Sequence, residues 1–152
     1  MPQDRLRPSS CSTARRRDRA IVLDEADRVL LCRFDLLEHG VVVWTMPGGG
    51  VEPDESPHEA LRRELHEEVG LVLTEEAPHV WHQRVVADGH ATGYDGVIND
   101  CYLVRTASFR PSGCLGEHVL RTENITGFRW WSIDELQAYG GGAVFGPRDL
   151  PL

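Results

Sequence analysis

The sequence contains no lysine, and all sixteen of its basic residues are arginine. This absence excludes Schiff-base catalysis and a P-loop, because both depend on a lysine amine. The cysteines lack a paired CxxC spacing, so neither a zinc frame nor a disulfide framework is expected. They are Cys11, Cys32, Cys101 and Cys114. No apolar run approaches the ~20 residues that span a bilayer, and no secretion segment follows the first arginines. We therefore expect a cytoplasmic protein without a membrane partner.

Positive charge is also scarce outside the N-terminal segment. Residues 1–19 hold six arginines against two acids, whereas the rest holds ten arginines against 22 acids. An acidic body repels a nucleic-acid backbone, so a polynucleotide partner is not expected. A phosphate-bearing substrate remains compatible with this charge if divalent cations lie between substrate and protein.

The length of 152 residues fits one domain. Residues 1–16 are rich in Arg, Ser and Pro and are predicted to form a disordered arm, followed by a folded domain over 17–152. Apolar runs predict strands, which lie at Ala20–Leu23, Val29–Phe34, Val41–Trp44, Val80–Ala87, Val97–Thr106 and Gly127–Ser132. A loop is expected over Asp88–Gly96 and a short helix over Ile133–Tyr139, with an uncertain tail from Gly140 onward. Strands on both sides of a central helix favour a single α/β domain with a mixed sheet.

The central helix is predicted to run from Pro57 to Val69. Ser56 suits its N-cap, proline suits its first position, and Gly70 suits its end. At roughly 100° per residue, Glu64, Glu67 and Glu68 share one face of this helix. An apolar stripe for the core lies next to that face.

Three neighbouring carboxylates repel one another, and a divalent cation that prefers oxygen ligands, such as Mg²⁺ or Mn²⁺, would relieve the repulsion. The alternative is an ordinary solvated acidic face. The glycine run Gly48–Gly50 favours the metal hypothesis, because it permits close backbone approach beside the acids.

Residues 49–71 resemble the signature of the Nudix hydrolase family, G-x5-E-x7-R-E-U-x-E-E-x-G-U with U aliphatic, and this segment is called the box below. Every fixed position matches; the matching residues are Gly49, Glu55, Arg63, Glu64, Leu65, Glu67, Glu68, Gly70 and Leu71. Weaker resemblance extends from about Ala20 to Leu136. It implies an α/β/α sandwich with a mixed sheet.

The resemblance also implies roles for individual residues. Glu64, Glu67 and Glu68 correspond to the metal-binding and catalytic acids, and the carbonyl of Gly48 to a further ligand. Glu55 and Arg63 correspond to an internal ion pair with a structural role. The family often adds an acid from a later loop, for which Glu123 is the first candidate and Glu117 its competitor.

The implied function is Mg²⁺-dependent hydrolysis of a diphosphate linkage in a small nucleotide, with Mn²⁺ as a substitute. Glu64 is the first choice for the base. The physiological substrate is open: the proline typical of ADP-ribose hydrolases is missing beyond the box, and Tyr94 comes late for a dinucleoside polyphosphate hydrolase. A non-catalytic nucleotide sensor and an isomerase of isopentenyl-type diphosphates are the rival functions. A homodimer is also left open.

Histidines and aromatic residues outside the box receive no catalytic role. His79 and His82 lie in a predicted strand without the HExxH spacing, so zinc is not expected there. Trp130 and Trp131 alternate across a strand, and at least one of them should lie in the core. Packing is also the expected role of four residues that could otherwise contact a nucleobase, namely Arg33, Phe34, Trp44 and Tyr94.

Overall fold

The computed structural model describes residues 14–36, 40–91, 94–112 and 124–146. They form one mixed sheet with the order β5-β6-β1-β2-β3-β8, in which β4 also pairs with β1 and β7 with β2. The strands are β1 (Ala14–Leu23), β2 (Val29–Leu36), β3 (Val41–Thr45), β4 (Gly48–Gly50), β5 (His79–Ala91), β6 (Tyr94–Arg105), β7 (Ile125–Trp131) and β8 (Val144–Gly146). Strand β1 runs parallel to β6 and antiparallel to β2 and β4. The prediction of a single α/β domain with a mixed sheet is confirmed.

Helix α1 (Pro57–Val69) has the predicted bounds, and its ends explain why. The Ser56 hydroxyl accepts a hydrogen bond from the Glu59 amide, and the Glu59 carboxylate accepts one from the Ser56 amide, which forms a reciprocal capping box. At the other end Gly70 takes the left-handed conformation, with φ of 77°. Both ends of the helix are therefore fixed by local sequence.

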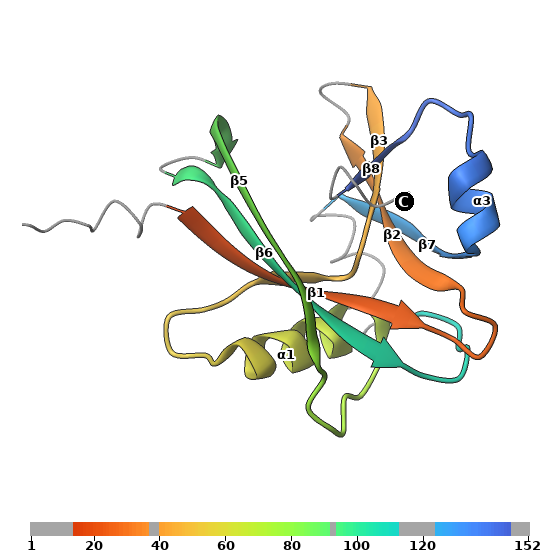
Figure 1. Cartoon of the computed structure of the whole chain (residues 1–152), viewed down its shortest axis with the longest axis horizontal. Coiled ribbons are helices and arrows are strands. Elements are labelled where there is room, and N and C mark those ends of the chain that lie inside the picture. Colours follow the sequence, from red (N-terminus) through yellow and green to blue (C-terminus); the bar gives the residue numbers. More distant parts are fainter. Residues whose placement is uncertain (1–13, 37–39, 92–93, 113–123, 147–152) are drawn as a thin grey trace, which may run out of the picture.

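Two apolar clusters lie on opposite faces of the sheet. Along β2, Leu30 and Cys32 belong to one cluster, whereas Val29 and Leu31 belong to the other. The first cluster contains the α1 residues Leu61, Leu65 and Val69, and the second contains Leu136 from α3 (Ile133–Ala138). Because alternate residues of a strand point to opposite faces, the sheet lies between the two helices. Figure 1 shows α1 on the side of β1 and β6, and α3 beside β2 and β7.

Two local predictions need correction, and the tail, uncertain from the sequence, contains a strand. Strand β1 begins at Ala14, inside the range assigned to the N-terminal arm, because its first residues pair with β6 from Gly96 onward. The predicted loop over Asp88–Gly96 is wrong, since β5 extends to Ala91 and β6 begins at Tyr94. The tail contains a strand, β8, which pairs in parallel with β3. In each case pairing with a distant strand outweighs local composition.

The aromatic prediction is confirmed, because Trp131 is 2% exposed and forms the centre of the second cluster. Its ring meets those of Trp44, Tyr139 and Phe145 edge-on at centroid distances of 5.2–5.7 Å. Cys32 and Cys101 are buried free thiols, while Cys11 and Cys114 lie outside the described residues. Among the described helices, none combines the length and the apolar character that a membrane crossing requires.

Candidate active site

The candidate site begins at the glycine strand β4, which lies against β1. Gly48 pairs with Arg19 and Gly49 with Asp18. Gly48 has a φ of 138°, and a Cβ there would collide with the backbone oxygen of Asp18. Only glycine fits this combination of conformation and close approach.

The predicted acids of α1 lie next to this strand. Glu68 is 7% exposed, and its Oε1 accepts a hydrogen bond of 3.0 Å from the backbone amide of Gly48. Glu64 lies directly over Gly49: a Cβ added to Gly49 would come within 2.6 Å of the Glu64 Oε1. The Glu67 side chain is more open, with 31% of its surface exposed. The three carboxylates therefore form a graded series from the buried side of the site to its open side.

Arg63 connects these acids to the loop before the helix. Its Nε and Nη2 donate to the two carboxylate oxygens of Glu55 at 2.7 and 2.9 Å, which is a bidentate pair. Nη2 also donates to the Gly50 carbonyl, while Nη1 donates to Glu64 at 3.0 Å and to Glu67 at 3.3 Å. The hydrogen bonds to Glu55 first, and then those to Glu64, raise the pKa of Arg63 above its ordinary value, although burial opposes them. The guanidinium thus fixes the loop, the glycine strand and two of the acids at once.

A second arginine, on β1, also contacts the glycine strand. Arg19 is 9% exposed, and its Nη1 donates to the carbonyls of Met46 and Gly48 at 3.2 and 3.3 Å. Burial lowers the Arg19 pKa, and the nearby Glu68 carboxylate is the largest opposing influence. Since a carbonyl oxygen has two lone pairs, the Gly48 oxygen keeps one that Arg19 does not use.

The donor set of this region fits a hard divalent cation. Glu64, Glu67 and Glu68 supply carboxylate oxygens from a single turn and a half of helix, and Gly48 supplies a carbonyl oxygen from the adjoining strand. Neither a histidine nor a thiol belongs to this set. Oxygen-only donors suit Mg²⁺ and Mn²⁺ better than zinc.

The other residues considered from the sequence have different positions. Glu117 and Glu123 lie outside the described residues, and so does the side chain of Tyr94. Trp44 and Phe34 each pack against an apolar cluster, and Arg33 pairs with Asp35 at 3.1 Å. Phe34 and Trp44 therefore pack as expected, whereas Arg33 forms an ion pair.

The structure brings together one cluster that the sequence pattern did not reveal. The side chains of His79 and His82 both contact the Oδ1 of Asp100, at 2.9 and 2.7 Å. Asp18, on the neighbouring strand, is in register with Asp100. Burial, followed by the Asp100 carboxylate, raises the Asp18 pKa to about 7. The sequence could not predict this cluster, because His79 and His82 are three residues apart and that spacing places side chains on opposite faces of a regular strand.

Comparison with known proteins identifies the family. The family model described as "NUDIX domain" matches residues 13–147, which is most of the chain. The chain belongs to the NUDIX family. The box geometry described above therefore lies in a domain of the expected kind, and the predicted resemblance is confirmed.

NUDIX relatives with assigned names include nucleoside triphosphatases. The nucleoside triphosphatase NudI of Klebsiella pneumoniae (strain 342) is 31% identical over 132 residues, covering 81% of this chain and 88% of that protein. NudI of Escherichia coli O9:H4 is 43% identical over 63 residues, but the match covers only 45% of that protein and 40% of this chain. The prediction of a Nudix-type hydrolase agrees with these names.

Solved NUDIX structures share the fold. The NUDIX domain of Shewanella oneidensis NrtR, solved in complex with ADP-ribose, superposes with a TM-score of 0.63 at 16% identity, covering 89% of this chain and 83% of that one. A MutT NUDIX hydrolase from Burkholderia pseudomallei superposes with a TM-score of 0.60 at 24% identity, covering 80% and 84%. At these identities the likeness supports the fold alone.

Proposed function

We propose that this chain is a magnesium-dependent hydrolase that cleaves a diphosphate linkage in a small nucleotide. The observation that carries the proposal is the arrangement of Glu64, Glu67 and Glu68. They extend from a buried position hydrogen-bonded to β4 to an open position at the surface. A helix face evolved only for solubility has no need of a buried glutamate held by a backbone amide.

We assign each residue of the site a role from its position. Glu68 and the Gly48 carbonyl form the buried side of the cation site, and Glu67 its open side. Glu64 accepts the proton of the attacking water, because it lies directly over Gly49, the neighbour of the Gly48 ligand. Arg63 and Glu55 hold the loop and the helix in this geometry and do not touch the substrate.

The reaction is a hydrolysis in which water adds across one phosphoanhydride bond. The water oxygen forms a bond to one phosphorus, and the bridging P–O bond breaks with its electron pair going to the departing phosphate. The proton goes to Glu64. Bound Mg²⁺ supplies the positive charge that neutralises phosphate oxygens in a site that is itself acidic.

Nucleoside triphosphates are the first substrate class to test. The support is the name of the Klebsiella pneumoniae relative, whose match covers most of both chains. The proline and tyrosine positions noted above give no reason to prefer ADP-ribose or a dinucleoside polyphosphate. Nucleoside diphosphates and nucleotide sugars complete the panel.

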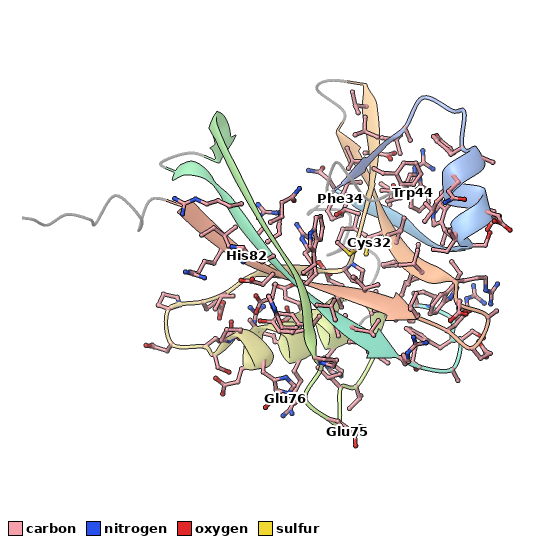
Figure 2. All side chains as sticks on the ribbon, in the orientation of Figure 1. Cys32, Phe34, Trp44, Glu75, Glu76 and His82 are labelled. Carbon is pink, nitrogen blue, oxygen red and sulfur yellow. The ribbon has the colours of Figure 1, made fainter. Side chains whose placement is uncertain are left out.

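The test compares Glu67→Gln with Glu75→Gln in a hydrolysis screen with and without Mg²⁺. Glu75 is an exposed acid in the segment between α1 and β5, where Figure 2 labels it, so its variant is a matched control. We expect Glu67→Gln to lose about 10²-fold or more in kcat while retaining its fold, and Glu75→Gln to match the wild type. Equal turnover in all three proteins would disprove the site. Nucleotide binding without any Mg²⁺-dependent cleavage would favour a sensor instead.

A further inference from the structure

Two strands and three side chains converge on one point outside the proposed active site. The Nε2 of His79 and the Nδ1 of His82, both on β5, lie 2.9 and 2.7 Å from the Oδ1 of Asp100 on β6. One atom from each side chain lies within 4.8 Å of the other two. Three potential metal-ligand atoms therefore surround a common centre.

An irregularity in strand pairing causes this convergence. The β5–β6 register shifts between His79 and Trp81: His79 pairs with Tyr102, whereas Trp81 pairs with Cys101. An extra residue in one strand at such a bulge reverses the alternation of side chains beyond it. His79 and His82 consequently reach the same face of the sheet. Bulges of this kind often redirect a side chain toward a functional site.

A buried carboxylate borders the same centre. Asp18 on β1 is the parallel partner of Asp100, so both side chains lie on one face of neighbouring strands. Asp18 is 2% exposed, and its Oδ2 has no hydrogen-bond partner among the described residues. A buried carboxylate oxygen without a partner is costly, and a cation beside it would remove much of that cost. This is an observation independent of the histidines.

We propose that His79, His82, Asp100 and Asp18 form a binding site for a divalent transition-metal ion of the zinc class, separate from the acids of α1. Two imidazole nitrogens with one or two carboxylates are ligands that zinc accepts and that Mg²⁺ does not prefer. Metal–ligand distances of about 2.0–2.2 Å place neighbouring ligand atoms roughly 3–3.5 Å apart. The ligand atoms of His79, His82 and Asp100 lie within 4.8 Å of one another, so small side-chain rotations bring these three to that spacing. His79 and His82 are about half exposed, so they are free to make them.

Arg16 lies beside the cluster but does not occupy its centre. Arg16 approaches the other oxygen of Asp100, with Nη1 4.0 Å from Oδ2, and its side chain is 66% exposed. The Oδ1 that both histidines contact is therefore not the oxygen that Arg16 approaches. An ion bound at Oδ1 would leave the Arg16 contact in place.

The proposed site shares β1 with the proposed active site. Asp18 pairs with Asp100 on one side and with Gly49, under Glu64, on the other. Two strand spacings of about 4.8 Å thus separate the backbones of Asp100 and Gly49, roughly 10 Å in all. Figure 2 labels His82 over the β5–β6–β1 part of the sheet, whereas Cys32 and Trp44 lie toward β2 and β3. A test must therefore distinguish the two sites.

The experiment titrates ZnCl2 into the untagged full-length protein by calorimetry, with saturating Mg²⁺ present to fill the acid site. Co²⁺ replaces Zn²⁺ in a parallel titration, in which visible absorption bands report nitrogen-containing coordination. The variants are His82→Ala, Asp100→Asn and Asp18→Asn, with His66→Ala, an exposed histidine of α1, as the matched control. Glu67→Gln tests whether the α1 acids take part. Circular dichroism checks that each variant is folded.

We expect one Zn²⁺ per chain, bound equally by the wild type, His66→Ala and Glu67→Gln. His82→Ala and Asp100→Asn should each lose more than about tenfold in affinity, together with the Co²⁺ bands. Asp18→Asn, which keeps the side-chain shape, should weaken binding without loss of fold; unchanged affinity would remove Asp18 from the site. The proposal is overturned if no Zn²⁺ binds, since the cluster is then only a histidine–carboxylate hydrogen-bond network. It is also overturned if binding is lost in Glu67→Gln and kept in His82→Ala, because the ion then occupies the α1 acids.

Discussion

Replacing Gly49 by alanine displaces a proposed catalytic carboxylate without changing its chemistry. The added Cβ would lie 2.6 Å from the Glu64 Oε1, 2.7 Å from its Cδ and 2.9 Å from its Oε2, whereas ordinary contacts begin near 3.4 Å. The whole carboxylate must therefore retreat by about 0.8 Å or more. Because the neighbour is a flexible side chain and Gly49 has an ordinary φ, the backbone can stay in place.

The expected cost to stability is small. Glu64 gives up its 3.0 Å hydrogen bond to Arg63, which is partly exposed, and adopts a less favourable rotamer. Each change costs about 0.5–1.5 kcal/mol, and relaxation recovers part of it. A fall in Tm of roughly 2–6 °C is expected for a domain of this size.

The expected cost to catalysis is much larger. A misplacement of about 1 Å at a reacting group lowers the rate by roughly 10²-fold. Mg²⁺-dependent hydrolysis by Gly49→Ala should therefore fall mainly in kcat, measured on the best substrate of the screen. Gly127→Ala is the control, because nothing lies within 4 Å of the Cβ it would add, and its kcat should equal that of the wild type.

The Gly49 and Gly48 variants distinguish an effect on catalysis from an effect on folding. If Gly49→Ala keeps its kcat within about threefold of the wild type, Glu64 is not near the reacting atoms and the proposed base is wrong. Gly48→Ala should behave differently, because its Cβ meets backbone and its φ of 138° is strained for alanine. That strain costs about 1–3 kcal/mol before the collision is counted. Gly48→Ala should therefore lose stability, and a fall in its activity would reflect unfolding.

Three further predictions concern stability. Arg63→Met should lower the free energy of unfolding by about 1–3 kcal/mol, because the Glu55 carboxylate loses both guanidinium hydrogen bonds; urea denaturation measures this, and an unchanged midpoint would contradict it. Leu65→Ala removes a fully buried side chain beneath the acids and should cost about 2–5 kcal/mol, again by urea denaturation, with a loss below 1 kcal/mol excluding tight packing there. Burial alone would raise the Asp24 pKa, but hydrogen bonds from Arg28 and a nearby backbone amide lower it below its ordinary 3.8. A carboxylate whose pKa is lower in the folded state stabilises the protein at a pH above its ordinary pKa, and this stabilisation is lost as the pH falls through the folded-state pKa. The wild type should therefore be more stable than Asp24→Asn at pH 6, and the difference should shrink below about pH 4.

The helix and its acids were predictable because their causes are local. A serine cap, a proline in the first turn and a terminal glycine act within a few residues of where they stand. The stripe of Leu61, Leu65 and Val69 follows from helical periodicity, and all three are fully buried. The contact between Arg63 and Glu55 was predicted only through the family resemblance, since eight residues separate them.

The rest depends on pairing between distant strands. Gly96 and its neighbours read as a loop, but the parallel partner strand β1 holds them in the sheet from Gly96 onward. The approach of Arg19 to the Gly48 carbonyl also requires the β1–β4 pairing. The meeting of His79 with His82 requires a bulge, which no periodic pattern encodes.

The charges around α1 support the proposal that a divalent cation binds beside the acids. At the proposed cation site, Glu55, Glu64, Glu67 and Glu68 contribute four negative charges, while Arg63 and the buried Arg19 contribute two positive ones. The excess of two negative charges equals the charge of one divalent ion. A nucleotide phosphate chain would add more negative charge at the same place, which Arg63 and Arg19 do not balance. The proposal therefore predicts that substrate affinity rises with Mg²⁺ concentration, with the two arginines arranging the carboxylates around the ion.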